Sequence, residues 1–250
     1  MVAGLTLVAV VAAAVVGKGS FYPAVKDSYF ELNYLKFRMV PKNLLVVRPT
    51  HFTKGTGTFV TTTSPKPGQN VLRMLGRNVP LEQVMALAYG GNPARIVPPL
   101  LKPNGNFDCL ITVPDQPRER FQAAVKKKLG YTAHWESRDT DVLLLETIAP
   151  NPPAFKLSHD SNGRSYFQSG KYWFFHMRPA SIMGYLEDSF KQPVLDRTGL
   201  TNFYDFSVAI SWRMNDEPTL DDLKNTLGKL GLKLEPATES IPMLVVEETH

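Results

Sequence analysis

Two stretches of equal length, KKKLGYTAHWESRDTDVLLLET (126–147) and LGKLGLKLEPATESIPMLVVEE (227–248), align with each other without a gap. Gly130 aligns with Gly231 and Glu146 with Glu247, so the offset is 231 − 130 = 101 residues. In both stretches a glycine ends a helix-like segment, as glycine commonly does, and apolar runs typical of strands follow. The pattern indicates an internal repeat.

The repeat extends upstream of these two stretches. Leu81 and Ile182 are also 101 residues apart, while Asp108 in NFDCLITV and Asp205 in FYDFSVAI are separated by 205 − 108 = 97 residues. The change of offset places a four-residue deletion in one loop of the second copy. We therefore expect the segment 71–148 to be echoed by the segment 171–248.

Helix caps and apolar spacing predict four helices, and short apolar runs between them predict strands. Asn78 and Thr219 are expected to open the first and the fourth helix, and Gly90 with Gly91 and Gly130 to end the first and the second. Along the chain the predicted strands occur in pairs and the predicted helices occur singly between them, which favours an α+β fold. We expect two similar halves, each with two helices packed on a small, mainly antiparallel sheet. The expected helices cover about 80–89, 117–129, 180–190 and 219–231, and the expected strands cover 44–52, 107–113, 131–136, 141–148, 171–177, 203–212, 232–236 and 243–248.

Composition shifts divide the chain into five segments. Thr, Gly, Pro and Lys dominate residues 53–70, which predicts a loop before the first repeat, and Pro, Ser and Gly mark residues 149–170 as a linker between the copies. The predicted organisation is an N-terminal segment, a connector with one strand and a loop, the first repeat, the linker and the second repeat, at 1–20, 21–70, 71–148, 149–170 and 171–250.

The N-terminal segment is apolar from residue 2 to residue 16 apart from Thr6. This run is shorter than the roughly 20 residues of a membrane-spanning helix and similar to the core of a signal peptide. Ala12–Ala14 supplies a cleavage site, although no basic residue precedes the run and Lys18 follows it. We expect export to the periplasm or cell envelope, by a cleaved signal or an uncleaved membrane anchor; a buried N-terminal helix or strand is the alternative.

The charge balance argues against a nucleic-acid-binding protein. There are 28 basic and 23 acidic residues, which give a net charge of +5 spread along the chain. The one basic run, Lys126–Lys128, ends a predicted helix, where cations suit the helix dipole. Cys109 is the single cysteine and excludes both an internal disulfide and a cysteine-based metal cage.

Motifs that carry catalytic chemistry are missing from the sequence. The five histidines show no H-x-H, H-x-x-H or H-E-x-x-H spacing, and no G-x-S-x-G nucleophile elbow or phosphate-binding loop occurs. We therefore expect no catalytic residue, no metal and no cofactor that sequence neighbours alone would define.

One stretch, PVLDRTGLTNFYDF (193–206), combines groups that could bind a ligand. It is similar to the Asp-Thr-Gly loop of aspartic proteases, but Arg197 interrupts the triplet and would lower, not raise, the pKa of a nearby carboxyl. The other interpretation is structural, because an aspartate at a strand start commonly accepts backbone hydrogen bonds and closes a turn. The binding candidates are Asp196, Arg197, Thr198, Gly199, Tyr204, Asp205 and Asp108.

The same stretch, with TLDDLKNTLGKLGLKLEPATESIPMLVVEETH (219–250), resembles the C-terminal signature of a large uncharacterised family abundant in soil bacteria. Its members carry a Pro-Val-hydrophobic-Asp-x-Thr-Gly-Leu turn, a Tyr-Asp-Phe strand and a Leu-Gly-Leu-x-Leu-Glu helix exit. The segments NVPLEQVMALAYGGNPARIV (78–97) and DVLLLETIAPNPPAFKLS (141–158) also look like that family, while Phe203 replaces its usual small residue. The resemblance covers roughly residues 44–250.

The resemblance implies an exported or membrane-anchored protein without an established activity. Similar domains occur behind membrane sensor-protease modules, and at the level of fold the halves look like the short N-terminal modules of secretins and TonB receptors. We therefore expect a non-enzymatic extracytoplasmic module that offers a strand edge or the cleft between its halves to another envelope protein. The alternative is a hydrolase or small-ligand receptor with its site between the halves. The sequence leaves the oligomeric state open.

Overall fold

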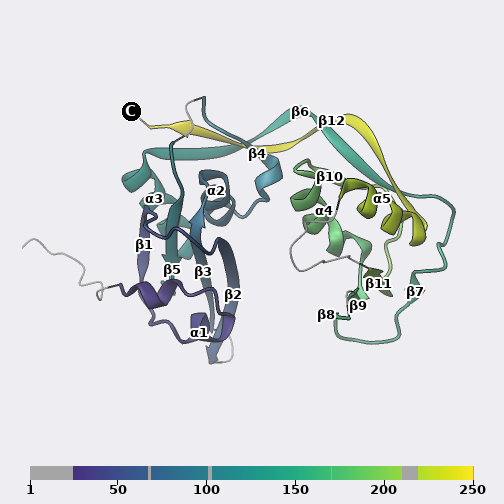
Figure 1. Ribbon diagram of the computed structural model, residues 1–250, viewed down its shortest axis with the longest axis horizontal. Coiled ribbons are helices and arrows are strands. Elements are labelled where there is room, and N and C mark those ends of the chain that lie inside the picture. Colours follow the sequence, from purple (N-terminus) through teal and green to yellow (C-terminus); the bar gives the residue numbers. More distant parts are fainter. Residues whose placement is uncertain (1–24, 67–68, 101–102, 170, 210–218, 250) are drawn as a thin grey trace, which may run out of the picture.

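The computed structural model describes residues 25–66, 69–100, 103–169, 171–209 and 219–249 (Figure 1). The predicted apolar segment 2–16 lies outside these residues. Among the helices of the described part, none is long and apolar enough to cross a bilayer. The helices are η1 (Asp27–Phe30), α1 (Tyr34–Met39), α2 (Leu81–Tyr89), η2 (Pro93–Arg95), α3 (Pro117–Leu129), η3 (Pro179–Ile182), α4 (Met183–Phe190) and α5 (Leu220–Lys229).

The strands form three four-stranded sheets with the orders β1-β5-β3-β2, β10-β6-β12-β4 and β7-β11-β9-β8. Figure 1 shows the first sheet in one lobe and the third in the other, with the long strands of the second sheet bridging them. The strands are β1 (Leu45–Pro49), β2 (Gly57–Lys66), β3 (Gln69–Val79), β4 (Ile96–Val97), β5 (Phe107–Ile111), β6 (Tyr131–Thr147), β7 (Lys156–Leu157), β8 (Arg164–Gln168), β9 (Lys171–Met177), β10 (Val194–Asp196), β11 (Tyr204–Ala209) and β12 (Leu232–Glu248).

The bridging element is an antiparallel ribbon of β6 and β12. The two strands are 17 residues each and pair along their whole length, from Tyr131 opposite Glu248 to Thr147 opposite Leu232. At a rise of about 3.3 Å per residue the ribbon is about 55 Å long. The sequence predicted two strands in each stretch; this was wrong, because the polar residues between the apolar runs pair with one another and continue both strands.

The ribbon exchanges core residues between the lobes. Leu244 and Val246 of β12 are buried in the core of the first lobe, among residues of β3, β5, α2 and α3. Leu145 of β6 is buried in the core of the second lobe, with residues of α4, α5 and β11. Each hydrophobic core therefore contains a strand that arrives from the opposite half of the chain.

A buried ion pair joins the lobes beside the ribbon. The Arg95 guanidinium in η2 donates from Nε and Nη2 to Oε1 of Glu187 in α4, at 2.7 and 2.6 Å. Arg95 Nη2 also lies 3.0 Å from the carbonyl oxygen of Val194, whose N–H donates to the same carboxylate oxygen at 3.1 Å. Because the Glu187 side chain is only 5% exposed, this contact fixes α4 against η2 with little competition from water.

The α+β class predicted from the sequence is confirmed, and so are the helix stops at Gly90 and Gly130, both in the left-handed conformation. Thr219 caps α5 as expected and forms a capping box with Asp222. Asn78, in contrast, does not cap α2, whose N-cap is Pro80.

Two segments expected to lack regular structure contain strands. The prediction of a loop over residues 53–70 was wrong, because β2 lies there and pairs with β3, and its Phe59 packs against Phe37 of α1. The segment 149–170 contains β7 and β8, the two edge strands of the third sheet. In both segments the content of Thr, Pro and Gly obscures a strand that pairs with the next strand in the chain, β2 with β3 and β8 with β9.

Gly76 in β3 marks the tightest packing of the first core. A Cβ there would lie 2.7 Å from Cys109 Sγ and 3.0 Å from Val79 Cγ2. We expect Gly76→Ala to lower the free energy of unfolding by about 1–3 kcal/mol, as overpacking does. Gly228→Ala in α5 is the control, since no atom lies within 4 Å of that position, and it should raise stability by up to about 1 kcal/mol. Urea unfolding measures both; equal effects would contradict the packing argument.

The contact between the lobes gives a second prediction. Arg95→Met removes the cation and leaves the Glu187 carboxylate buried, so we expect a loss of about 2–4 kcal/mol in urea unfolding at pH 7. The control is Arg197→Met, which removes an ion pair with Glu239 whose side chains are 53% and 36% exposed, and should cost under about 1 kcal/mol. The double variant Arg95→Met/Glu187→Leu should recover most of the loss, and a failure to recover would show that the charge is not the cause.

Candidate functional site

The turn that contains Asp196, Thr198 and Gly199 is closed by its own side chains. Asp196 Oδ1 accepts hydrogen bonds from the backbone N–H of Thr198 at 3.0 Å and from its hydroxyl at 2.7 Å. The Thr198 hydroxyl oxygen in turn accepts from the N–H of Leu200 at 3.2 Å. Gly199 has a φ of 69°, in the region that favours glycine. The polar atoms of this turn are therefore largely used to hold its shape.

Arg197 in the same turn points to the ribbon. Its guanidinium lies 3.4 Å from Oε1 of Glu239 in β12, and its backbone N–H donates to the carbonyl oxygen of Leu145 at 2.9 Å. The expected ion pair therefore forms with Glu239, on a neighbouring strand, and both side chains are partly exposed.

Asp108 is fully buried at the start of β5 and holds the end of β3. Its carboxylate accepts from the Thr50 hydroxyl at 2.8 Å, the Asn78 backbone N–H at 3.0 Å and Arg48 Nε at 3.4 Å. Asn78 has a φ of 52° and sits where the pairing of β3 with β5 shifts register. The carboxylate thus stabilises a strained bulge next to α2.

Asp205 has the same role in the second lobe. It accepts from the backbone N–H of His176 at 2.9 Å, and His176 has a φ of 51° where the pairing of β11 with β9 shifts register. A hydrogen bond from the Ser158 side chain, with the one from His176, holds the pKa of Asp205 below its usual value despite some desolvation. Asp108, Asp196 and Asp205 therefore each serve a separate turn, and the structure does not bring them into one site.

Tyr204 lies beside a cavity in the second lobe. The cavity has a volume of about 340 Å³ and is lined by Leu200 and Asn202 from the loop before β11 and by Phe155 and Leu157 from the segment around β7. The Tyr204 ring packs edge-on against Phe155, with ring centroids 5.9 Å apart. Of the predicted binding residues, Tyr204 is the one that lines this cavity.

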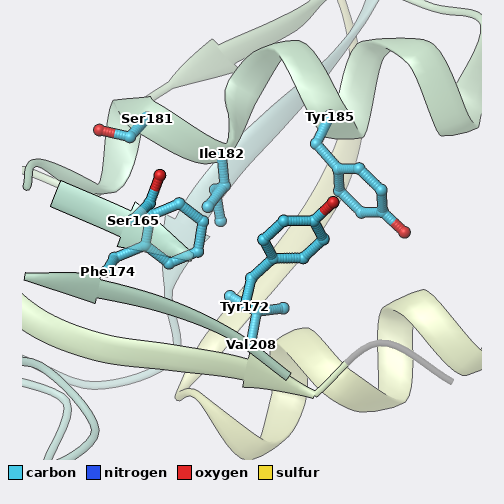
Figure 2. Close-up of a pocket in the computed structure, with 7 residues that line it drawn as sticks. All are labelled: Ser165, Tyr172, Phe174, Ser181, Ile182, Tyr185 and Val208. Carbon is cyan, nitrogen blue, oxygen red and sulfur yellow. The ribbon is translucent and has the colours of Figure 1, made fainter. Parts of the chain in front are cut away.

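A second cavity of about 220 Å³ lies between α4 and the inner face of the third sheet. Figure 2 shows the Tyr172 hydroxyl directed toward the ring of Tyr185, with Phe174 and Ile182 closing the other side. Burial raises the pKa of Tyr185, whose hydroxyl is buried without a hydrogen-bond partner among the described residues. The lining is mostly apolar with a few hydroxyls, and it holds no acid and base pair for catalysis. Among the described residues, no group of His, Cys, Asp and Glu is arranged to hold a metal ion.

The outer face of β8 and β9 carries a cluster of aromatic rings, which we call the aromatic face: Tyr166, Trp173 and Phe175. Strand alternation sends Tyr172 and Phe174 inward to the core and leaves Trp173 and Phe175 on the other side. The Phe175 ring is nearly parallel to those of Tyr166 and Trp173, at 19° and 14°, with centroids 5.8 and 6.4 Å away.

Cations border the aromatic face. The guanidinium of Arg164 lies 4.9 Å from the centre of the Phe175 ring, and Lys171 Nζ lies 5.9 Å from the Trp173 ring. Tyr166 lies on β8, a strand of five residues, and its side chain is 44% exposed. The stretch KYWFFHM shows the alternation of the aromatics of β9. No sequence pattern indicates that Tyr166 lies opposite Trp173, because β8 falls in the segment that was expected to be a linker.

The contribution of Asp205 to the stability of the protein should depend on pH. Because the pKa of Asp205 is lowered in the folded protein, its ionised form stabilises the fold at neutral pH, and this contribution disappears as the pH falls through the lowered pKa. Asp205→Asn resembles the protonated acid, so it should be less stable than the parent at pH 7 and nearly equal to it well below pH ~4. Urea unfolding at both pH values tests this, with the exposed Asp139→Asn as the control; a constant difference would contradict it.

Comparisons with known proteins identify a family for this chain. A family model described as a protein of unknown function (DUF3738) matches residues 82–249, about two thirds of the sequence. The match runs from the first turn of α2 to β12 and so contains the ribbon, α2 to α5 and the aromatic face. Neither the curated proteins nor the solved structures include a significant match. The chain belongs to the DUF3738 family of proteins of unknown function.

Proposed function

We propose that this protein is a non-enzymatic binding module of the cell envelope, exported or anchored through residues 2–16. Its function is to hold an extended segment of another envelope protein along β8 and over the aromatic face. The observation that carries the proposal is the position of Tyr166, Trp173 and Phe175 at the edge of a sheet, with a cation at each end of the cluster.

The edge position of β8 supports the proposal. In the order β7-β11-β9-β8, strand β8 pairs with β9 and with no other described strand, so its other side offers backbone donors and acceptors to an added strand. A partner segment would form main-chain hydrogen bonds with β8 and place alternate side chains over the aromatic rings. Aromatic and arginine side chains are the residue types that dominate binding energy at such contacts.

The charges favour an acidic partner segment. Arg164 and Lys171 lie at the two ends of the paired region, where Arg164 is opposite Phe175 and Lys171 is opposite Gln168. Asp160 pairs with Arg164 at 2.9 Å, but both side chains are exposed, so a partner carboxylate can compete for the guanidinium. We infer a segment that alternates apolar and acidic residues.

We also propose that the two lobes arose by duplication. Both halves run strand, helix, short strand, strand, helix, long strand, from β3 to β6 and from β9 to β12. The short strands β4 and β10 pair in parallel with the long strands β12 and β6, with Leu244 opposite Ile96 and Leu143 opposite Val194. Leu143 and Leu244 are 244 − 143 = 101 residues apart, which is the repeat offset. Comparison of the two segments across family members is the test, and loss of the offset there would contradict it.

The hydrolase alternative receives no such support. An acid–base pair needs two groups that converge on one reacting atom. Asp108 is buried and engaged in the first lobe, whereas Asp196 and Asp205 hold separate turns in the second half of the chain.

Site-specific crosslinking tests the binding surface. A photoreactive phenylalanine analogue at Tyr166 should crosslink to one envelope protein in cells, and Trp173→Ser should reduce that product at least tenfold, since a central aromatic contact contributes about 2 kcal/mol or more. Trp135 on β6 is the matched control position, because its side chain is 44% exposed, as is that of Tyr166.

The two crosslinking positions separate the outcomes. Equal products from Trp135 and Tyr166 would mean non-specific capture and would count against the aromatic face. A product at Tyr166 that Trp173→Ser leaves unchanged would count against the role of the rings. Circular dichroism of the variant confirms that the fold is intact.

A further inference from the structure

Helix α1 presents an apolar side that no part of the described chain covers. Leu35 and Met39 are one turn apart and are 71% and 84% exposed, whereas Phe37 on the opposite side is buried. Lys36 and Arg38 lie between them on the flanks of the helix. We call Leu35, Lys36, Arg38 and Met39 the α1 surface.

Buried contacts fix the orientation of α1. Its N-cap, Asn33, accepts hydrogen bonds from the N–H groups of Leu35 and Lys36. At its other end, Nη1 of Arg73 lies 3.2, 3.0 and 2.7 Å from the carbonyl oxygens of Phe37, Arg38 and Val40. Arg73 is 4% exposed, so these bonds are shielded from water. A six-residue helix is thereby held rigidly, with Leu35 and Met39 directed outward.

The region around α1 is basic. Residues 25–42 contain Lys26, Lys36, Arg38 and Lys42 against Asp27 and Glu31, a net charge of 4 − 2 = +2. Asp27 is paired with Arg48 and His51. Glu31 is paired with Lys36, but these side chains are 41% and 62% exposed, so a lipid phosphate can compete for the Lys36 ammonium. Hydrogen bonds from Arg48 and His51 also lower the pKa of Asp27, which keeps that pairing in place. Exposed apolar side chains flanked by cations are typical of a surface that contacts anionic lipid.

Helix α1 lies close in sequence to the apolar segment 2–16, which also favours a membrane contact. Val25, where the described chain begins, packs in the same buried cluster as Phe37 of α1. Residues 17–24 separate Val25 from the apolar segment 2–16, and eight residues span at most about 30 Å. With the segment 2–16 in a bilayer, the cluster that contains α1 stays within that distance of the lipid.

We propose that the α1 surface rests on an anionic bilayer, with Leu35 and Met39 among the lipid headgroups and Lys36 and Arg38 beside their phosphates. The inference rests on the membrane anchoring included in the proposed function. It adds an orientation: the first lobe stands on the membrane through α1, and the ribbon, which joins it to the second lobe, crosses the opposite end of the first lobe (Figure 1).

A fluorescent label tests the contact in the full-length chain. Met39→Cys carries an environment-sensitive fluorophore, and Lys224→Cys on exposed α5 carries the same label as the control. Cys109 is 0% exposed and stays unlabelled in the folded protein. The chain is reconstituted in vesicles of phosphatidylethanolamine and phosphatidylglycerol. We expect a blue-shifted emission that brominated lipid quenches at least twofold for the label at 39, and no quenching at 224.

A charge variant tests the role of the cations. Lys36→Glu/Arg38→Glu should reduce the quenching at 39 in the anionic vesicles and leave it unchanged in vesicles of phosphatidylcholine alone. Flotation of the vesicles reports anchoring separately. A chain that floats while the label at 39 behaves like that at 224 overturns the α1 contact and leaves the anchoring intact. A chain that does not float overturns both, and quenching by a labelled second copy in place of lipid shows a protein interface at α1.

Discussion

The pairing of β6 with β12 is the interaction on which the rest of the structure depends. It is the longest ladder of the described chain, and it delivers Leu244 and Val246 to one core and Leu145 to the other. Within the described part of the chain, the short strands β4 and β10 pair only with the ribbon, β4 with β12 and β10 with β6, so their place in the second sheet also relies on it. Buried apolar area, not the ribbon's exposed polar centre, provides its stability, since exposed cross-strand pairs such as Ser137 with Ser240 contribute little.

The lobes differ in how well they are packed. In the first, Gly76 lets β3 approach Cys109 so closely that one added carbon would overlap the sulfur. In the second, the aromatic residues Tyr172, Phe174 and Tyr185 leave a cavity of about 220 Å³ under α4. Large rigid rings fill irregular space less completely than small aliphatic groups. The second lobe, which carries the aromatic face, is therefore the one with room to adjust.

The helices could be predicted from the sequence because their signals are local. Gly90 and Gly130 end two helices, and Thr219 with Asp222 begins a third. The strands were harder to predict, since a strand is stabilised by the strand it pairs with and not by its own residues alone. Residues 58–62 resemble a loop by composition, but they pair with β3. Residues 138–141 resemble a turn, but they pair with residues 238–241. For the candidate site, the sequence analysis included the structural role of Asp108 and Asp205 as one of two interpretations. The aromatic face could not be predicted, because it depends on how β8 pairs with β9.

The exchange of strands through the ribbon sets the order in which the molecule can fold. The first lobe buries side chains from residues 47 to 131, but it also needs Leu244 and Val246, which a ribosome or an export channel delivers far later. Contacts so distant in sequence are slow to form. Until β12 pairs, the apolar residues that it covers in the first lobe are exposed. A chain of this design gains from being kept unfolded until its last strand has been synthesised.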